Sequence, residues 1–144
     1  MNAQQMWKAY SQMEQINADY EAWAFGDDAD ELARLVREGI KTATASAYPL
    51  YVLEGEELPK AGEYSVILDS QENAVCIIRT GNVYVVPFSE VSGEHARKEG
   101  EGDRSLAYWR QVHERFFKGE LAEAGLTFDE SVKVVCEEFE KVYP

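Results

Sequence analysis

Residues 64–86 read YSVILDSQENAVCIIRTGNVYVV, and this stretch decides the fold class. It contains three short runs of apolar or β-branched residues, which is the composition of β-strands: residues 64–68, 74–80 and 83–86. The polar segment 69–73 separates the first two runs, and the pair Gly81-Asn82 separates the last two. Short polar or Gly-Asn connections are typical of hairpins. The stretch therefore predicts an antiparallel, meandering sheet.

The rest of the chain predicts helices around this sheet and two further strands. Helical spacing of apolar residues, with capping residues at the ends, predicts helices over residues 1–20, 31–38, 48–53, 94–98 and 105–122. The remaining strand-like runs are residues 41–47 and 132–139. No regular crossover helices separate the strands, so we expect an α+β fold with a small curled sheet or barrel flanked by helices.

The bulk composition predicts one folded domain over residues 1–144. Hydrophobic residues make up 45% of the 144 residues, and the aromatic residues are spread along the whole length. No apolar run is long enough to span a bilayer, and the N-terminus does not read as a signal peptide. Cys76 and Cys136 lie in predicted strands and are expected to be buried thiols. We therefore predict a cytoplasmic protein that does not bind membranes.

The charge of the chain limits its partners. There are 14 basic and 27 acidic residues, a formal net charge of −13. A protein that neutralises many phosphates needs a basic face, so binding of duplex nucleic acid is excluded. A local pocket is still compatible with one nucleoside or nucleotide, or with a short single-stranded RNA. The oligomeric state is not predicted.

The first candidate site is the segment GIKTAT at residues 39–44, between a predicted helix and a predicted strand. Gly39 ends the helix, Lys41 supplies a cation, and alternation in a strand places Thr42 and Thr44 on one face. A lysine here can hold a phosphate or a carbonyl oxygen, or activate a hydroxyl group. The alternative is an ordinary helix cap followed by a threonine-rich strand. The segment lacks the spacing of a P-loop, which excludes that route of ATP or GTP hydrolysis.

The second candidate site is the acidic stretch at residues 94–103, which includes Glu99 and Asp103. Its carboxylates can carry protons or hold a hard cation, although the spacing is not that of an EF-hand. The alternative is a solvated loop in which Asp103 or Ser105 caps the next helix. His95 and His113 are not spaced as a zinc site, so we predict neither a metal ion nor a cofactor. His113 is expected to be a half-buried, hydrogen-bonded imidazole on the long helix.

Taken in order, these motifs resemble the ASCH domain family, which is related to the PUA RNA-binding fold, and in particular its larger bacterial branch. The resemblance covers nearly the whole chain. It rests on WAFG at 23–26, GIKTAT at 39–44, LP at 58–59 with GEY at 62–64, PFSEV at 87–91, EGEGD at 99–103 with SL at 105–106, and WR at 109–110 with His113 and FF at 116–117. It implies a PUA-like, mixed or antiparallel β-barrel of about five or six strands with an N-terminal helical extension.

The resemblance also implies a site. Some small members of the family hydrolyse N4-acetylcytidine with a threonine, a lysine and a glutamate, which correspond here to Thr44, Lys41 and Glu99. Other members are associated with RNA binding or RNA cleavage. In the implied reaction Lys41 takes the Thr44 proton, Thr44 attacks an amide carbonyl, and Glu99 passes a proton to the leaving amine. The ligand-binding residues expected around this centre are Gly39, Thr42, Tyr48, Arg79, Asp103 and Trp109.

Two of these assignments and the activity itself have alternatives. Tyr48 or Trp109 is expected to stack on a base, because aromatic faces accept any base. Arg79 either faces the ligand or is a surface residue at the end of a strand. The chain as a whole is either an amidohydrolase acting on a modified nucleoside or a non-catalytic module that binds RNA or a nucleotide.

Overall fold

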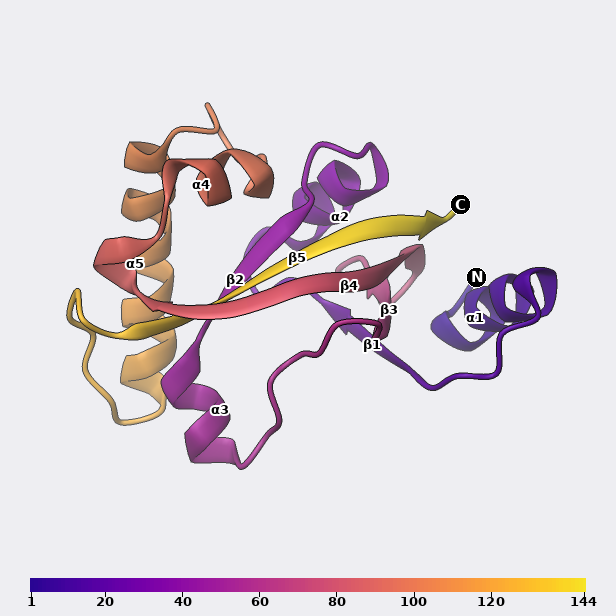
Figure 1. The fold of residues 1–144 in the computed structure, drawn as a ribbon, viewed down its shortest axis with the longest axis horizontal. Coiled ribbons are helices and arrows are strands. Elements are labelled where there is room, and N and C mark those ends of the chain that lie inside the picture. Colours follow the sequence, from indigo (N-terminus) through magenta and orange to yellow (C-terminus); the bar gives the residue numbers. More distant parts are fainter.

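The computed structural model describes residues 1–144 (Figure 1). Along the chain its elements are α1 (Ala3–Glu14), β1 (Tyr20–Ala24), α2 (Ala29–Arg37), β2 (Ala43–Ala47), α3 (Tyr48–Glu54), β3 (Tyr64–Leu68), β4 (Ala74–Pro87), the 3-10 turn η1 (Phe88–Glu90), α4 (Gly93–Glu99), α5 (Leu106–Glu123) and β5 (Lys133–Tyr143). Helices α4 and α5 lie at one end of the sheet and α1 at the other (Figure 1).

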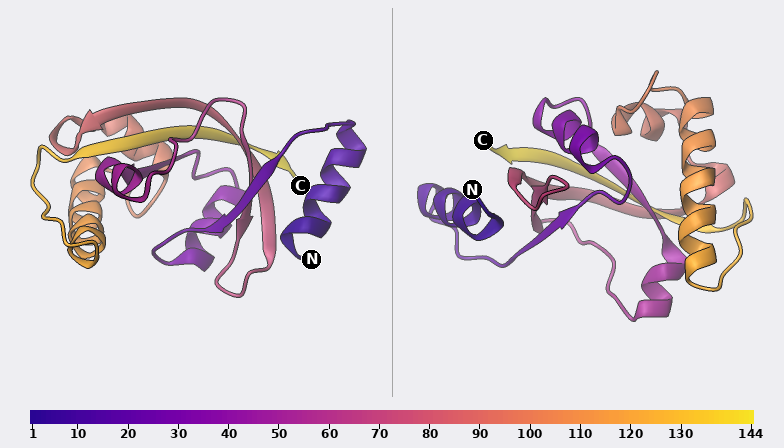
Figure 2. Two further views of the ribbon diagram at one scale, coloured as in Figure 1. Left: turned by 90° about the horizontal axis from the view of Figure 1, so that it is seen from below. Right: turned by 180° about the vertical axis from the view of Figure 1, so that it is seen from behind.

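The five strands form one sheet in the order β1-β3-β4-β5-β2. Strands β1 and β3 are parallel, and every other neighbouring pair is antiparallel. The sheet curls into a half-barrel: in the left view of Figure 2, the long strands β4 and β5 arch over the helices beneath them. The predicted α+β class and PUA-like architecture are therefore confirmed with five strands, although the edge strands β1 and β2 do not pair to close a barrel.

Alternation along β3 and β4 assigns the N-terminal helices to opposite faces of the sheet. Val66 and Ile77 pack with α1 residues, whereas their neighbours Ile67 and Ile78 pack with α2. All four side chains are fully buried, as expected for strands covered on both faces. The third part of the core lies beneath α4 and α5, where Phe88, Trp109, Phe117, Leu121, Val134 and Cys136 pack together.

The predicted hairpin at Gly81-Asn82 is wrong. The two flanking runs form one 14-residue strand, β4, and β5 pairs with it on both sides of the glycine. Thr80 pairs with Phe139 and Val83 with Glu137, so residues 81 and 82 lie opposite the single residue Glu138. This arrangement is a β-bulge, in which Gly81-Asn82 bends a continuous strand. The bulge occurs in the long pair of strands that forms the arch.

The end of the predicted N-terminal helix is also wrong. Helix α1 ends at Glu14, where Gln15 adopts a left-handed conformation with φ 56°. Residues Tyr20–Ala24 form the strand β1, which was not predicted and which pairs in parallel with β3. The strand escaped prediction because its exposed and half-buried residues do not alternate.

The other elements match the sequence predictions to within a few residues. Helix α3 begins with Pro49 in its first turn, and both cysteines are buried and unpaired. Asp30 lies in the first turn of α2, where its carboxylate accepts hydrogen bonds from Ser70. None of the helices is long and apolar enough to cross a membrane.

Candidate functional site

Lys41 is buried at the junction between α2 and β2, where its side chain is 1% exposed. Gly39 has φ +78° and lets the chain turn sharply after α2, so that the Ile40 and Lys41 N–H groups both donate to Leu35. Thr42 then fixes the chain in space. Its N–H and its hydroxyl donate to the Lys98 carbonyl at 2.7 and 3.3 Å, and its own carbonyl accepts from Phe139. These bonds place Lys41 at the C-terminal end of α4.

Two carboxylates meet the Lys41 ammonium group there. Its Nζ atom donates to Glu99 Oε1 at 3.0 Å and to Glu101 Oε2 at 2.8 Å, and it lies 3.5 Å from the Glu99 carbonyl oxygen. Gly100 separates the two glutamates and ends α4 with φ +72°. This left-handed residue reverses the chain, so that carboxylates two positions apart reach the same cation.

Three aromatic side chains complete the surroundings of Glu99. His95, one turn earlier on α4, lies 2.7 Å from Glu99 Oε2, and the Trp109 Nε1–H donates to the same oxygen at 2.6 Å. His113 stacks on Trp109 with ring centroids 4.2 Å apart, and its Nε2 lies 3.5 Å from Glu99 Oε1. Each pair, His95 with Glu99 and Trp109 with His113, is four residues apart on a helix and so shares a face.

These contacts set the protonation of the cluster formed by Lys41, Glu99, Glu101, His95, Trp109 and His113. Burial by itself would raise the pKa of Glu99. Lys41, His113 and the hydrogen bonds lower it by more than burial raises it, so the pKa is held well below its ordinary value. Burial is also the main influence on Glu101, and here it prevails and raises the pKa. Glu99 is therefore a fixed anion, while Glu101 is the carboxylate better suited to gain and lose a proton.

His113 carries positive charge more readily than an ordinary histidine. Burial lowers its pKa, but the Glu99 and Glu101 carboxylates and the Trp109 carbonyl raise it more, so the net shift is upward. Its Nδ1 lies 2.9 Å from the Trp109 carbonyl, which only accepts, so Nδ1 bears a proton. With Lys41 and His113 both protonated, their charges balance those of Glu99 and Glu101.

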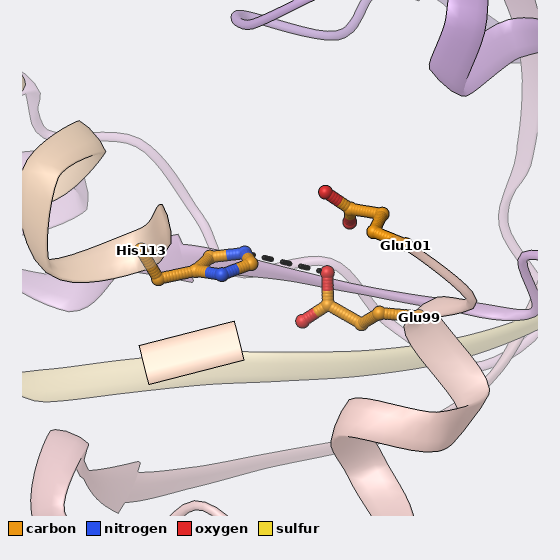
Figure 3. Close-up of side chains that lie close together, drawn as sticks. All are labelled: Glu99, Glu101 and His113. Carbon is orange, nitrogen blue, oxygen red and sulfur yellow. Dashed lines mark ion pairs between the residues drawn. The ribbon is translucent and has the colours of Figure 1, made fainter. Parts of the chain in front are cut away.

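Figure 3 shows Glu99, Glu101 and His113 pointing toward one another from α4, from the turn after it and from α5. One ligand atom from each of these three side chains lies within 4.8 Å of the others, which is close enough to hold a metal ion. Lys41 already supplies a cation in contact with both carboxylates. An ion bound to them would face the repulsion of this ammonium group, so the arrangement is that of an ion-pair cluster.

A cavity of about 800 Å³ lies beside this cluster. Phe25 joins the two, because its ring lines the cavity and its centroid is 5.4 Å from Lys41 Nζ. Thr44 lines the cavity and is paired across β2 and β5 with Glu137, which lines it too. The aromatic lining residues are Trp23, Phe25, Tyr51 and Phe116, and the hydroxyl-bearing ones besides Thr44 and Tyr51 are Ser46, Ser65 and Thr80.

The structure brings together only part of the predicted site. Lys41, Glu99 and Trp109 are in one cluster, and Thr44 lines the adjoining cavity. Gly39 and Thr42 position the segment that carries Lys41 and Thr44. The other three predicted ligand residues make contacts elsewhere: Tyr48 lies against Lys133, Arg79 is exposed against the Tyr64 ring, and Asp103 accepts from the Ser105 N–H before α5.

Three members of the cluster were not predicted as site residues, namely His95, Glu101 and His113. Their separations in sequence from Lys41 exceed 50 residues, so only the tertiary fold brings them to it. One signal was available for His113: it lies four residues after Trp109 on a predicted helix, on the same face. For His95, the same spacing to Glu99 was present.

A second, shallower hollow of about 570 Å³ lies on α2, beside the turn that contains Ser70. It is lined by Arg34 and Arg37 together with acidic and polar residues. Arg34 is already paired with Glu31 and Glu38. None of the predicted site residues lines this hollow.

Comparison with known proteins identifies a matching family and solved structures with the same fold. A family model described as the ASCH domain matches residues 21–143. The crystal structure of an ASCH domain from Lactobacillus crispatus is 32% identical with a TM-score of 0.91, and the match covers 98% of this chain and 94% of that one. A protein of known structure from Enterococcus faecalis is 39% identical with a TM-score of 0.92, covering 99% and 88% of the two chains.

A more distant structure, the hypothetical protein PH0355, shares the fold alone. It is 18% identical with a TM-score of 0.57, over 85% of this chain and 98% of that one. No curated protein matches the chain.

Proposed function

The chain belongs to the ASCH domain family, and on that basis we propose that it binds the base of a nucleoside, a nucleotide or a short RNA in the cavity lined by Thr44 and hydrolyses an amide on that base. The observation that carries this proposal is the placement of Thr44. It lines a cavity of about 800 Å³. Phe25 lines the same cavity, and its ring centroid lies 5.4 Å from the Nζ atom of Lys41, which is paired with Glu99.

The lining of the cavity supports the recognition of a base. Four aromatic side chains offer flat surfaces, and base–aromatic stacking is worth about 1–3 kcal/mol per base. Tyr51 is held in place by a 2.8 Å hydrogen bond between its hydroxyl and Ser46. In this proposal Tyr51 and its aromatic neighbours replace Tyr48 and Trp109 as the stacking residues.

The proposed chemistry begins with attack of Thr44 Oγ1 on the amide carbonyl, and it needs a base for the hydroxyl proton. The Lys41 ammonium group donates hydrogen bonds to three oxygen atoms, so it can take the Thr44 proton only after losing one of its own. Glu101, at 2.8 Å and with a raised pKa, is the group suited to accept that proton. We therefore assign proton transfer to the leaving amine to Glu101, while Glu99 holds Lys41 and the two histidines in place. A water molecule then attacks the ester formed on Thr44, which releases the carboxylic acid and restores the Thr44 hydroxyl.

The competing function is a non-catalytic module that binds RNA or a nucleotide, in which Thr44 is only part of the lining. The decisive experiment measures release of cytidine from N4-acetylcytidine by chromatography, alongside binding of the same compound by calorimetry. The variants are Thr44→Ala and, as a matched control, Thr127→Ala, an exposed threonine that does not line the cavity.

The enzyme proposal expects turnover by the wild type and the Thr127→Ala variant, and binding without turnover by Thr44→Ala. Binding with no turnover by the wild type identifies the non-catalytic module. Absence of N4-acetylcytidine binding by the wild type overturns the proposed amide hydrolysis in this cavity.

A further inference from the structure

We infer that the ligand enters the cavity with an amine-bearing end, uncharged or cationic, pointing inside, and that Glu137 accepts a hydrogen bond from this amine. A phosphate group does not enter the cavity. The inference rests on the proposed function, because it concerns the same cavity. It makes Glu137 a residue that determines specificity, and it narrows the ligand class from nucleotides and RNA to free nucleosides whose base carries an amine.

Glu137 is a buried carboxylate with one oxygen free for a ligand. The residue is 7% exposed, and its Oε2 accepts a 2.7 Å hydrogen bond from the Thr80 hydroxyl. Its Oε1 has no partner within the protein, yet no fully buried side-chain oxygen or nitrogen lacks a hydrogen bond. Oε1 is therefore accessible from the cavity that Glu137 lines. A desolvated carboxylate oxygen of this kind favours a donor, and a donor with positive charge most of all.

The position of Glu137 relates it to the proposed reacting atom. Glu137 on β5 is directly opposite Thr44 on β2, and both side chains line the cavity. Side chains opposite each other on one face of an antiparallel pair have Cβ atoms about 4.5–5.5 Å apart. A ligand that reaches Thr44 with an amide on its base therefore places the nitrogen of that amide within reach of Glu137. The hydrogen bond from Thr80 fixes the orientation of the carboxylate before the ligand arrives.

The charge of the lining excludes phosphate. Of the residues that line the cavity, six are glutamates and none is lysine, arginine or histidine: Glu21, Glu56, Glu57, Glu63, Glu120 and Glu137. Burial, with a further contribution from Glu63 and Glu21, raises the pKa of Glu137, which reflects the cost of its negative charge in this place. A cation or an amine donor relieves that cost, whereas a phosphate group adds to it. Lys41 does not compensate, because two other carboxylates already hold it.

The test compares ligands that differ in one group, by calorimetry at low ionic strength. Cytidine carries an amine where uridine carries a carbonyl oxygen, and cytidine 5′-monophosphate adds a phosphate to cytidine. We expect cytidine to bind about tenfold more tightly than uridine, which is the order of discrimination of a good polar base contact. We also expect it to bind about tenfold more tightly than the monophosphate, because the acidic lining repels the phosphate. These three measurements need only the wild-type protein.

The variant Glu137→Gln keeps an oxygen for Thr80 and presents an amide N–H₂ group to the cavity. It is expected to bring the ratio of cytidine to uridine affinity down to about one or below, since an amide donates to the uridine oxygen. The matched control is Glu140→Gln, an exposed glutamate on the same strand that does not line the cavity, which should leave the ratio unchanged.

The failures are distinguishable. Equal affinity for cytidine and uridine, or affinity for the monophosphate as high as for cytidine, overturns the inference and leaves the proposed function intact. A wild-type preference for cytidine that Glu137→Gln leaves unchanged overturns the role of Glu137. Absence of binding by every nucleoside overturns the inference and the proposed function together.

Discussion

The Nζ atom of Lys41 lies 3.0 Å from Oε1 of Glu99, and the side chains of both residues are 1% exposed. The two residues are 58 positions apart in the chain, so this ion pair forms only when β2 and α4 have come together. A buried charge without its partner is costly, which links the stability of the fold to the integrity of the site.

The first prediction concerns the loss of that cation. Lys41→Met keeps most of the side-chain volume but leaves the Glu99 and Glu101 carboxylates without their ammonium partner. Breaking a buried ion pair in this way costs about 3–5 kcal/mol, measured as the free energy of unfolding in urea. The control is Lys118→Met, an exposed lysine 3.6 Å from Glu114, which should change stability by less than about 1 kcal/mol. Equal effects of the two substitutions contradict the account.

The second prediction concerns Gly100, which places Glu99 and Glu101 on the same cation. A Cβ atom added at Gly100 would lie 2.5 Å from the Ile40 carbonyl oxygen, and φ there is +72°. Gly100→Ala should therefore destabilise the protein by more than about 2 kcal/mol, since the left-handed conformation alone costs about 1–2 kcal/mol.

Gly119 is the matched control for this substitution. It lies inside α5, and an added Cβ atom would meet nothing within 4 Å. Gly119→Ala should stabilise the protein by about 0.5–1 kcal/mol. Thermal unfolding of the two variants, followed by circular dichroism, should therefore show midpoint shifts of opposite sign. An unchanged or raised midpoint for Gly100→Ala would show that the Gly100 turn is not required.

The third prediction concerns the pH dependence of stability. The pKa of His113 is raised in the fold, so the stability contributed by its protonated form is fully present below about pH 6.5, the ordinary value, and is lost as pH rises through the folded value. The pKa of Glu99 is lowered, so its contribution is present above about pH 4.3 and is lost as pH falls. The stability that His113 and Glu99 contribute therefore declines as pH rises through the folded pKa of His113 and as pH falls through the folded pKa of Glu99.

The measurement is urea unfolding between pH 6 and pH 9 for the wild type and for His113→Phe, which can still stack on Trp109. The difference in unfolding free energy between the two proteins should shrink as pH rises. A difference that is constant over this range would show that His113 is not charged in the folded state.

The sequence predicted the architecture because most elements carry a local signal. The runs at residues 64–68 and 132–139 are apolar and β-branched, and the long helix begins at a capping serine, Ser105, whose hydroxyl accepts from Tyr108. The Gly81-Asn82 pair misled for a physical reason. A turn and a bulge both suit a glycine, and only the pairing with β5 distinguishes them.

The site was predictable only in part. The resemblance to the ASCH family selected Lys41, Thr44 and Glu99, and two of these are in direct contact. The resemblance also selected Asp103, and Arg79 was chosen as a charged residue at the end of a predicted strand. In the structure Arg79 lies against the Tyr64 ring, and the Asp103 carboxylate accepts from the Ser105 N–H. Glu137 was expected only as an ordinary strand residue, because its burial depends on the packing of β5 between β2 and β4 in the folded sheet.

The central claim is that the cavity between Thr44 and Glu137 is the ligand site. A crystal structure of the Thr44→Ala variant soaked with N4-acetylcytidine tests it most directly. The account predicts a base among the aromatic side chains of the cavity, with its N4 atom within hydrogen-bonding distance of Glu137 Oε1. Ligand density at the Arg34–Arg37 hollow, with no ligand in the cavity, would contradict it.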